Sequence, residues 1–425
     1  MKVGGRIAVP GDKSISHRAL IFGALGEGTS RITGLLDSAD VRSTAGVLAS
    51  LGVAVPAVNS TEVVVTGVGP RGPRGPRGLR AASGDLDAGN SGTTTRLMAG
   101  VLAAHPFTSR VIGDASLSKR PMGRIARPLT EMGATFAFER GDGLPMAVTG
   151  GGLRGLTWHS DTASAQVKGA LLLAGYCAGV PVEVHEPVLS RDHTERMMRA
   201  RGVDVRSEGT VATLVPGAAM RARDVRVPGD PSSAAFFASL AALARGGDLE
   251  LPGVLANPAR TGAFRVLDRM GAHVGWEDIE DAGGEPIATL VARPRTLVGT
   301  TIEPDEVPSL IDELPVLACV AARAAGETRV TGAHELRVKE SDRIALVVRN
   351  LRAVGADAEE LPDGFVVRGT DRPFAGRIVT EGDHRIAMAF AVLGAATGGA
   401  IEVDDRGCVG VSYPMFWSDL ARACA

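Results

Sequence analysis

The sequence predicts an α/β protein of two domains, and three features of the chain point to that class. Its 425 residues are enough for about two domains of ordinary size, each with a hydrophobic core of its own. Segments with helical periodicity repeatedly end in glycine and continue into β-like runs. A short glycine-containing motif near the N-terminus recurs about halfway along the chain. Together these features predict six similar units, three in each domain.

The repeated pattern consists of an amphipathic helix, a glycine and a β-like run. It reads VLASLGVAV from Val47, LTEMGATFAF from Leu129, MMRARGVDV from Met197, VLDRMGAHV from Val266 and NLRAVGADA from Asn350. The glycines, which are predicted to be left-handed helix C-caps, are Gly52, Gly133, Gly202, Gly271 and Gly355. A sixth copy is predicted in the C-terminal YPMFWSDLARACA, without a following strand. Spacings of roughly 70 to 85 residues exceed those of solenoid repeats, so each copy is expected to contain more than one strand.

A short motif that occurs twice marks the predicted domain boundary. The chain reads VPGDKS from Val9 and VPGDPSS from Val227. We interpret the two copies as the two places where the chain passes from one domain to the other. One domain then covers residues 11–229, and the other combines residues 1–10 with 230–425. Glycine absorbs backbone changes that other residues resist, so a hinge is expected near 10–12 and 228–230. The active site is then expected in the cleft between the domains.

Composition excludes several classes of function. With 44% hydrophobic and 22% charged residues the chain is typical of a globular protein, and no apolar run approaches the roughly 20 residues of a membrane helix. The N-terminus has no signal-peptide segment, so a cytoplasmic protein is predicted. A net charge of −2 gives no general attraction to nucleic acid. The cysteines lack metal-ligand spacing, which predicts mostly buried free thiols and no metal site; they are Cys177, Cys319, Cys408 and Cys424.

Residues 69–84 contain three Pro-Arg-Gly triplets and predict an exposed loop. A nucleic-acid-binding loop is the alternative, but no aromatic residues are interleaved for base stacking.

In the predicted first domain, polar and basic residues gather where helices begin. PGDKSISHRAL places Lys13, Ser14 and Arg18 on the first turns of a helix that Asp12 precedes. Free backbone N–H groups, the helix dipole and these side chains together favour an anion site. Other helix starts and loops of this domain add Asn90, Gly92, Arg120, Ser164, Ala165, Gln166 and Ser190. The alternative is an ordinary cap with a solvated basic face.

The second domain combines acidic and basic residues at its helix starts. They are Asp312 in PSLIDELP, Lys339, Glu340 and Arg343 in RVKESDR, and His384 and Arg385 in GDHRIAMA. A salt-bridged helix face is the alternative for any one of these runs. Because the charges precede apolar helices and do not line them, they favour a site for a small polyanion. The carboxylates Asp312 and Glu340 are then candidates for acid and base catalysis.

Seven motifs in order resemble the 5-enolpyruvylshikimate-3-phosphate synthase family over nearly the whole chain. They are PGDKSISHRAL, GNSGTTTR, GDASLSKRPM, SAQVKGALLLA, SRDHTE, RVKESDR and GDHRIAMA. The resemblance implies an inside-out α/β barrel, with three βαββαβ units per domain and buried helices. It implies a transferase of the shikimate pathway, which leads to chorismate and the aromatic amino acids. The enolpyruvyl group of phosphoenolpyruvate moves to the 5-hydroxyl of shikimate 3-phosphate, with release of phosphate and without metal or organic cofactor.

The resemblance also implies roles for individual residues. It assigns the catalytic set to Lys13, Asp312, Glu340 and His384. Asp312 would accept the 5-hydroxyl proton, and Glu340 would protonate the methylene carbon of phosphoenolpyruvate. The implied shikimate 3-phosphate contacts are Lys13, Ser14, Arg18, Ser164, Ala165, Gln166, Ser190, Asp312 and Lys339. The implied phosphoenolpyruvate contacts are Lys13, Asn90, Gly92, Arg120, Gln166, Arg343 and Arg385.

Some positions depart from the family pattern. Val411 and Ser412 stand where some members have a phosphoenolpyruvate-binding lysine, and Ala165 stands where others have serine, which leaves at most a backbone contact. The motifs resemble the branch with glyphosate-tolerant enzymes, whereas Gly92 is the small residue associated with sensitivity, so sensitivity stays open.

Two rival functions remain. UDP-N-acetylglucosamine enolpyruvyl transferases usually carry a cysteine in the loop that reads DASLSKRPM here. A non-catalytic phosphate- or RNA-binding protein would not need Asp312 and Glu340 among its cations. A monomer is expected, because a two-domain clamp needs no partner.

Overall fold

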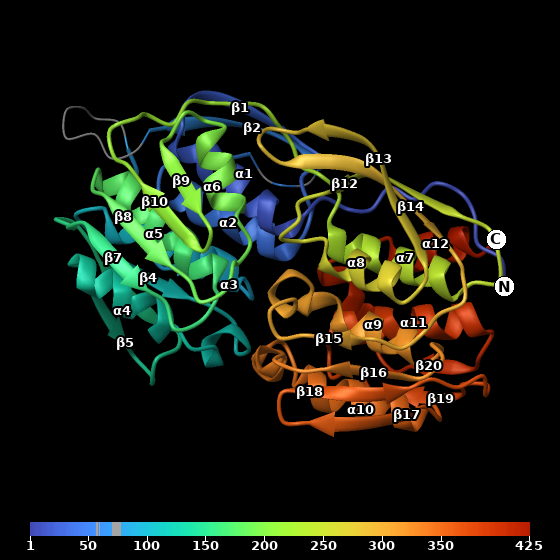
Figure 1. Ribbon diagram of the computed structural model, residues 1–425. Helices are drawn as coiled ribbons and strands as arrows, with labels where there is room; N and C mark the ends of the chain where they lie inside the picture. The colour runs from blue at the N-terminus through green and yellow to red at the C-terminus, as the bar shows by residue number, and fades with distance from the viewer. Residues whose placement is uncertain (57, 59, 70–77) are drawn as a thin grey trace. The chain divides into compact units, whose positions relative to one another are not determined.

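The computed structural model describes residues 1–56, 58, 60–69 and 78–425, which form two compact units (Figure 1). Unit 1 comprises Met1–Pro10, Pro228–Glu280 and Pro286–Ala425, and unit 2 comprises Gly11–Val227 and Asp281–Glu285. Residues 70–77, the middle of the loop predicted over 69–84, lie outside the described residues.

The unit boundaries differ in detail from the predicted domains. Pro228 and Gly229 belong to unit 1, because Gly229 N donates to Gly253 O at 2.8 Å and Gly229 bridges Val254 in parallel. The short segment Asp281–Glu285 belongs to unit 2, where Glu285 Oε1 lies 2.7 Å from His193 Nδ1.

A complete repeat unit contains four strands and two helices in the order β-α-β-α-β-β. One copy consists of β7 (Leu156–His159), α5 (Ala165–Ala178), β8 (Val182–His185), α6 (His193–Arg199), β9 (Val205–Glu208) and β10 (Val211–Leu214). Its sheet order is β7-β8-β10-β9, in which only the β7–β8 pair is parallel. A parallel pair needs a crossover helix, whereas the closing antiparallel pair needs only a turn. This explains why the elements follow this order and not the βαββαβ order that the resemblance implied.

Three further copies follow the same order. The first consists of β3 (Leu86–Asp87), α3 (Gly92–Ala103), β4 (Thr108–Ile112), α4 (Gly123–Met132), β5 (Thr135–Phe138) and β6 (Met146–Thr149). The second consists of β15 (Thr301–Ile302), α9 (Leu314–Ala321), β16 (Glu327–Val330), α10 (Arg343–Ala353), β17 (Asp357–Leu361) and β18 (Gly364–Arg368). The C-terminal copy has only β19 (Gly376–Ile378), α11 (His384–Thr397), β20 (Ile401–Val403) and α12 (Phe416–Ala423). Thus, as predicted, no strand follows the helix of the sixth copy.

In the two remaining copies a distant part of the chain supplies the first strand. One has α1 (Lys13–Leu25), β1 (Glu27–Thr33), α2 (Ala39–Ser50) and β2 (Glu62–Val68), and β11 (Val225–Arg226) pairs in parallel with β1. The other has α7 (Pro231–Leu243), β12 (Leu249–Leu255), α8 (Gly262–Arg269), β13 (His273–Asp281) and β14 (Pro286–Arg293). Beside β12, Val3 and Arg6 form parallel bridges to Gly247 and Glu250. The N-terminal residues therefore belong to unit 1 because they complete its first sheet.

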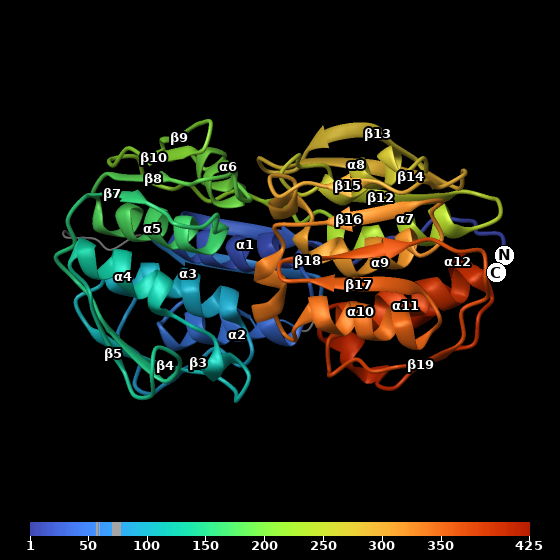
Figure 2. The same cartoon turned by 60° about the horizontal axis from the view of Figure 1, so that its bottom comes forward.

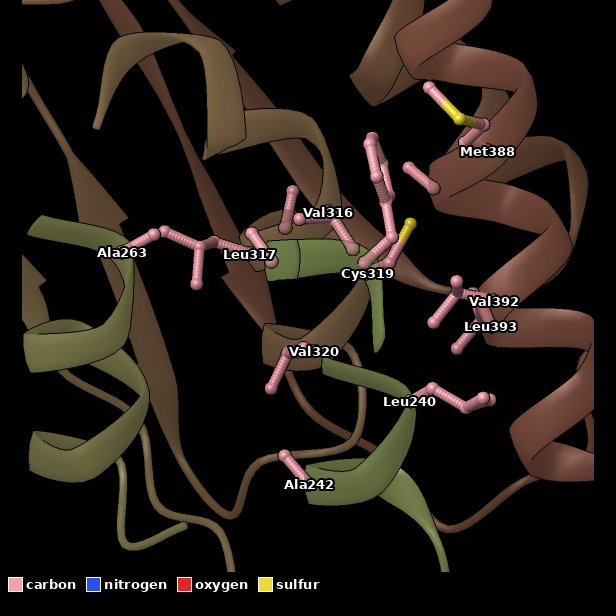
Figure 3. Packing of buried hydrophobic residues seen from close by; sticks show 14 of the residues in the cluster. Leu240, Ala242, Ala263, Val316, Leu317, Cys319, Val320, Met388, Val392 and Leu393 are labelled. Carbon is pink, nitrogen blue, oxygen red and sulfur yellow. The ribbon is translucent and has the colours of Figure 1, made fainter. Parts of the chain in front are cut away.

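The first helix of every copy is buried, as the resemblance implied. In unit 2, α1, α3 and α5 lie between the sheets (Figure 2). In unit 1, α7, α9 and α11 pack on one another, with Leu240, Val316 and Val392 in the same apolar cluster (Figure 3). The second helix of each copy buries only part of its surface. The described residues form six sheets, three in each unit, around these buried helices.

The predicted left-handed glycines are confirmed. The φ angles are 89° at Gly52, 118° at Gly133, 85° at Gly202, 101° at Gly271 and 93° at Gly355. Each follows the amphipathic helix of its copy and turns the chain into the next segment.

Two composition-based predictions can be compared with the described residues. No helix among them is both long and apolar enough to cross a membrane. Cys177 and Cys319 are buried, whereas Cys408 and Cys424 are partly exposed.

Candidate active site

In unit 2 the helix α1 begins at Lys13. Asp12, which is fully buried, accepts a hydrogen bond from Ile15 N at 2.8 Å and caps the helix. The Lys13 ammonium forms an ion pair with Asp40, and 34% of the Lys13 side chain stays exposed. Burial acts to raise the pKa of Asp40, but the charge and the hydrogen bond of Lys13, with other neighbouring groups, together lower that pKa. Lys13 is therefore held at the helix N-terminus beside the ionised carboxylate of Asp40.

Arg18 connects the starts of three helices of unit 2. Its Nε donates to Thr194 Oγ1 at 2.8 Å on α6, and its Nη1 donates to Ser14 O at 3.1 Å on α1. Its Nη2 lies 3.5 Å from Ala165 O at the start of α5. Burial lowers the pKa of Arg18 to about 10, so the guanidinium is still charged at neutral pH. The predicted residues Ser14, Arg18 and Ala165 thus lie together.

The loop before α3 places a second group of predicted residues in contact. Arg120 Nη2 donates to Asn90 Oδ1 at 2.7 Å, and Asn90 Nδ2 donates to Asp114 Oδ2 at 2.6 Å. Gly92 is the first residue of α3, where a Cβ would lie 3.6 Å from Arg120 Nη1. The absence of a side chain at Gly92 therefore lets the Arg120 guanidinium lie close to the start of α3.

Sequence analysis missed Arg96, which lies in the same group. Its Nη1 donates to Gln166 Oε1 at 2.7 Å, and Gln166 Nε2 donates to Thr93 Oγ1 at 3.1 Å. A Cβ on Gly92 would lie 2.9 Å from Arg96 Nη1. The predicted Gln166 is thus fixed between two residues of α3.

The predicted serines of unit 2 contact one carboxylate that the prediction did not include. Ser164 N donates to Glu186 Oε1 at 2.9 Å, and Ser190 Oγ donates to Glu186 Oε2 at 2.9 Å. Glu186 is buried and follows β8. Nothing local in the sequence distinguishes Glu186 from a surface carboxylate, because its contacts with Ser164 and Ser190 arise only when the chain folds.

In unit 1 the predicted carboxylate Asp312 lies among three cations. Its Oδ1 is 3.5 Å from Lys339 Nζ and 3.5 Å from Arg343 Nη1. Arg385 Nη1 donates to the backbone oxygen of Asp312 at 3.0 Å. Asp312 lies in a short 3-10 helix, Ile311–Glu313, directly before the buried helix α9. The carboxylate is only 13% exposed and is surrounded by positive charge.

Arg343 is held by two carboxylates. Its Nη2 lies 2.7 Å from Glu340 Oε2 and its Nε lies 2.8 Å from Asp383 Oδ2. Burial acts to raise the pKa of Glu340, but the charge of Arg343 and further neighbouring groups, Lys339 among them, together lower that pKa well below its ordinary value. In this arrangement Glu340 is ionised at neutral pH, so a role as general acid requires a change that raises its pKa.

His384 and Arg385 begin α11. Burial, followed by the charge of Arg385, lowers the pKa of His384 to about 3, so the imidazole is neutral at neutral pH. Asp383 caps α11 by accepting from Arg385 N at 2.9 Å. Arg385 Nη1 also lies 3.5 Å from Glu313 Oε1. The buried groups Asp383 and Glu313 were not among the predicted residues, although Asp383 stands at the cap of a predicted helix.

The predicted site residues therefore form two sets, one in each unit. The unit 2 set lies at the starts of α1, α3 and α5 and in the loops before α4 and α6; it comprises Lys13, Ser14, Arg18, Asn90, Gly92, Arg120, Ser164, Ala165, Gln166 and Ser190. The unit 1 set lies at the starts of α9, α10 and α11; it comprises Asp312, Lys339, Glu340, Arg343, His384 and Arg385. Within the described ranges, no group of three or more His, Cys, Asp or Glu side chains could hold a metal ion.

Comparisons with known proteins show the family of the chain. A family model described as EPSP synthase (3-phosphoshikimate 1-carboxyvinyltransferase) matches residues 1–420. A 3-phosphoshikimate 1-carboxyvinyltransferase of Desulforudis audaxviator is 47% identical over 413 residues, covering 97% of this chain and 95% of that protein. The protein of the same name from Aquifex aeolicus is 45% identical and covers 99% of this chain and 97% of its own length.

Solved structures give the same relationship for the fold. The EPSP synthase of Acinetobacter baumannii superposes with a TM-score of 0.89 at 44% identity, covering 99% of this chain and 96% of that chain. The enolpyruvyl transferase NikO from Streptomyces tendae has a TM-score of 0.74 at 17% identity, which shows the fold alone. The predicted two-domain barrel with buried helices is confirmed.

Proposed function

The chain belongs to the EPSP synthase (3-phosphoshikimate 1-carboxyvinyltransferase) family, and from this premise we propose that it transfers the enolpyruvyl group of phosphoenolpyruvate to shikimate 3-phosphate. The acceptor is the 5-hydroxyl, and the products are 5-enolpyruvylshikimate 3-phosphate and phosphate. The structural observation that carries the proposal is the Asp312 carboxylate among Lys339, Arg343 and Arg385. A base surrounded by cations suits a reaction between two anionic substrates.

The carboxylates of unit 1 supply the acid and the base in this proposal. Asp312 accepts the proton of the attacking 5-hydroxyl, and its carboxylate lies among three cations. Glu340 delivers a proton to the methylene carbon, which makes the adjacent carbon electrophilic. Neutral His384 lies beside both arginines and adds no charge to the site. In the second step a proton leaves the methyl group that received one, the bond between the adjacent carbon and the phosphate oxygen breaks, and the enolpyruvyl double bond re-forms. The arginines stabilise the negative charge of the released phosphate.

The other residues bind the substrates. For shikimate 3-phosphate we propose Lys13, Ser14, Arg18, Ser164, Ala165, Gln166, Ser190, Asp312 and Lys339. For phosphoenolpyruvate we propose Lys13, Asn90, Gly92, Arg120, Gln166, Arg343 and Arg385. Both sets then act on one pair of substrates, and the expected cleft with hinges near 10–12 and 228–230 remains a prediction.

Three further proposals complete this function. The reaction needs no metal or organic cofactor, because protein cations neutralise the phosphates. The enzyme acts as a monomer, because one chain carries every proposed site residue. It works in the cytoplasm.

Two rival functions are less well supported. A UDP-N-acetylglucosamine enolpyruvyl transferase would have a cysteine in the loop that runs through Arg120, and that loop has none. A phosphate- or RNA-binding protein without catalysis leaves Asp312 and Glu340 unexplained.

Phosphate release from the purified protein, without added metal, tests the proposal. The protein is mixed with phosphoenolpyruvate and either shikimate 3-phosphate or UDP-N-acetylglucosamine. We expect release only with shikimate 3-phosphate. Release only with the nucleotide sugar would assign the other acceptor, and release with neither would contradict the transferase activity.

A further inference from the structure

A buried carboxylate in unit 2 joins the two serines that are proposed to bind shikimate 3-phosphate. Glu186 Oε1 accepts from Ser164 N at 2.9 Å. Glu186 Oε2 accepts from Ser190 Oγ at 2.9 Å, and Ser190 N lies 3.4 Å from the same oxygen. Ser164 precedes α5 and Ser190 precedes α6, so one side chain fixes two separate segments of backbone.

The contacts require a carboxylate at this position. Both oxygens of Glu186 act as acceptors, and Oε2 also lies 2.7 Å from Lys168 Nζ. A neutral amide has one acceptor oxygen and one donor nitrogen. Its nitrogen would face either Ser164 N, whose contact is then lost, or the Lys168 ammonium, whose ion pair is then lost. Replacement by glutamine therefore keeps the size but disrupts either a serine contact or the counter-ion that holds the carboxylate in place.

The buried charge of Glu186 is balanced within unit 2. Lys168 Nζ lies 2.8 Å from Glu195 Oε1 in addition to its contact with Glu186, and all three side chains are at most 2% exposed. Burial acts to lower the pKa of Lys168, but Glu195 and Glu186 raise that pKa above its ordinary value. Lys168 therefore stays charged and keeps both carboxylates paired.

We propose that Glu186 is a positioning residue for shikimate 3-phosphate, which it serves by holding Ser164 and Ser190 in their binding arrangement. This inference rests on the proposed function. Glu186 does not touch the substrate in this proposal; it acts through the two serines and needs Lys168 as its counter-ion.

Glu195 offers a matched control. It shares Lys168 and is as deeply buried, and its Oε1 lies 2.8 Å from Lys168 Nζ. Glu186→Gln and Glu195→Gln each remove one buried negative charge beside Lys168, which by itself would favour binding of an anion. The loss of serine positioning acts in the opposite direction and only in Glu186→Gln. The two effects therefore differ in sign.

The test is steady-state kinetics with each substrate varied, together with thermal unfolding of each variant. For Glu186→Gln we expect the KM for shikimate 3-phosphate to rise about tenfold, as for loss of one hydrogen bond to a charged group. The KM for phosphoenolpyruvate and kcat should change by less than about threefold, well under one such hydrogen bond. Glu195→Gln should leave the KM for shikimate 3-phosphate unchanged or lower.

An equal rise in both variants would overturn the proposal, since it would reflect general loosening of the buried cluster. An unchanged KM in Glu186→Gln would overturn it as well. If Glu186→Gln does not fold, Glu186→Asp retains the charge opposite Lys168 but withdraws the oxygens from the serines, and the same rise in KM is expected. Wild-type enzyme is assayed alongside the variants. An inactive wild type would contradict the proposed function. An active wild type with unaffected variants would contradict only the role of Glu186.

Discussion

Arg343 donates from Nε to the Asp383 carboxylate at 2.8 Å, and both side chains are at most 1% exposed. The same carboxylate accepts from Arg385 N at 2.9 Å as the cap of α11. Asp383 therefore orients both arginines of unit 1 that are proposed to bind phosphoenolpyruvate. Burial acts to raise the pKa of Asp383, but the charge and the hydrogen bond of Arg343, with other neighbouring groups, together lower that pKa, so the carboxylate is ionised.

Asp383→Asn is expected to weaken phosphoenolpyruvate binding selectively. An amide nitrogen would face the Arg343 guanidinium, and a lost hydrogen bond to a charged group costs about 1.5–3 kcal/mol. The KM for phosphoenolpyruvate should rise about tenfold or more, since each 1.4 kcal/mol is a factor of ten. Initial rates with each substrate varied measure this, and equal rises for both substrates would indicate a general loss of structure in unit 1.

Asp312→Asn and Glu340→Gln are expected to reduce turnover far more than binding. A positioned acid or base contributes about 10²–10⁴ in rate, so kcat should fall by at least about a hundredfold in each variant. The affinity for shikimate 3-phosphate should stay within about tenfold, or 1.4 kcal/mol. Calorimetric titration of the purified variants measures that affinity, and lost affinity at an unchanged rate would make both residues structural.

Binding of phosphoenolpyruvate is expected to draw a proton onto Glu340. Without ligand, Arg343 lies 2.7 Å from Glu340 and holds the pKa of that carboxyl below its ordinary value. Anionic groups of phosphoenolpyruvate compete for Arg343 and place negative charge near Glu340, and both effects raise its pKa. Proton uptake follows when the pKa rises toward the pH of the solution.

Calorimetry of phosphoenolpyruvate binding near pH 6, in buffers of different ionisation enthalpy, measures the uptake. Glu340→Gln should remove it and Glu335→Gln, another partly buried glutamate of unit 1, should not. Equal uptake in wild type and Glu340→Gln would assign the proton to another group.

The sequence predicted the parts of the site that have local causes. Lys13, Ser14 and Arg18 could be placed because Asp12 caps a helix whose remaining length is apolar, and both signals lie within a few residues. The contact of Arg96 with Gln166 could not be predicted, since it joins residues 70 positions apart and depends on the packing of α3 against α5. Glu186 was also not predicted, because its contacts with Ser164 and Ser190 depend on how the segments before α5 and α6 pack.

In the fold, too, features that depend on neighbouring residues were predicted, and features that depend on distant contacts were not. The glycine C-caps are local and were predicted at every position. The repeated motif from Val9 and Val227 lies where the chain passes from one unit to the other, after Pro10 and after Val227. Assignment of Asp281–Glu285 to unit 2 was not predicted, since the turn between β13 and β14 gives no sign that Glu285 pairs with His193.

Acid is expected to destabilise unit 2 through His17. Burial lowers the pKa of His17 to about 3, below its ordinary value of 6.5. Between these values the unfolded chain binds a proton that the folded chain does not, so stability falls as pH decreases from about 6.5 toward 3, by about 1.4 kcal/mol per pH unit. His384 acts in the same direction in unit 1.

Thermal unfolding of wild type and His17→Asn between pH 7 and pH 4 checks this expectation. Asparagine retains a polar atom that can reach Thr44 Oγ1, which lies 2.7 Å from His17 Nδ1. The melting temperature of His17→Asn should fall less steeply with acid than that of wild type. His334→Asn is the control, since the His334 side chain is already 66% exposed. Parallel curves for wild type and His17→Asn would show that His17 is not the source.

Gly92→Ala is expected to impair the phosphoenolpyruvate site without unfolding unit 2. The added Cβ would lie 2.9 Å from Arg96 Nη1 and 3.6 Å from Arg120 Nη1, which are the mobile ends of long side chains. Arg96 must therefore move, and its hydrogen bond to Gln166 at 2.7 Å is weakened. Loss of about 1 kcal/mol in that contact should raise the KM for phosphoenolpyruvate about fivefold.

Gly100→Ala distinguishes this local effect from ordinary overpacking in the same helix. There a Cβ would meet the backbone oxygen of Ala170 at 2.1 Å, so the melting temperature should fall sharply. Gly92→Ala should keep a melting temperature near that of wild type and raise the KM for phosphoenolpyruvate, since the new methyl group displaces Arg96. A Gly92→Ala enzyme with unchanged KM would show that phosphoenolpyruvate does not approach this helix start.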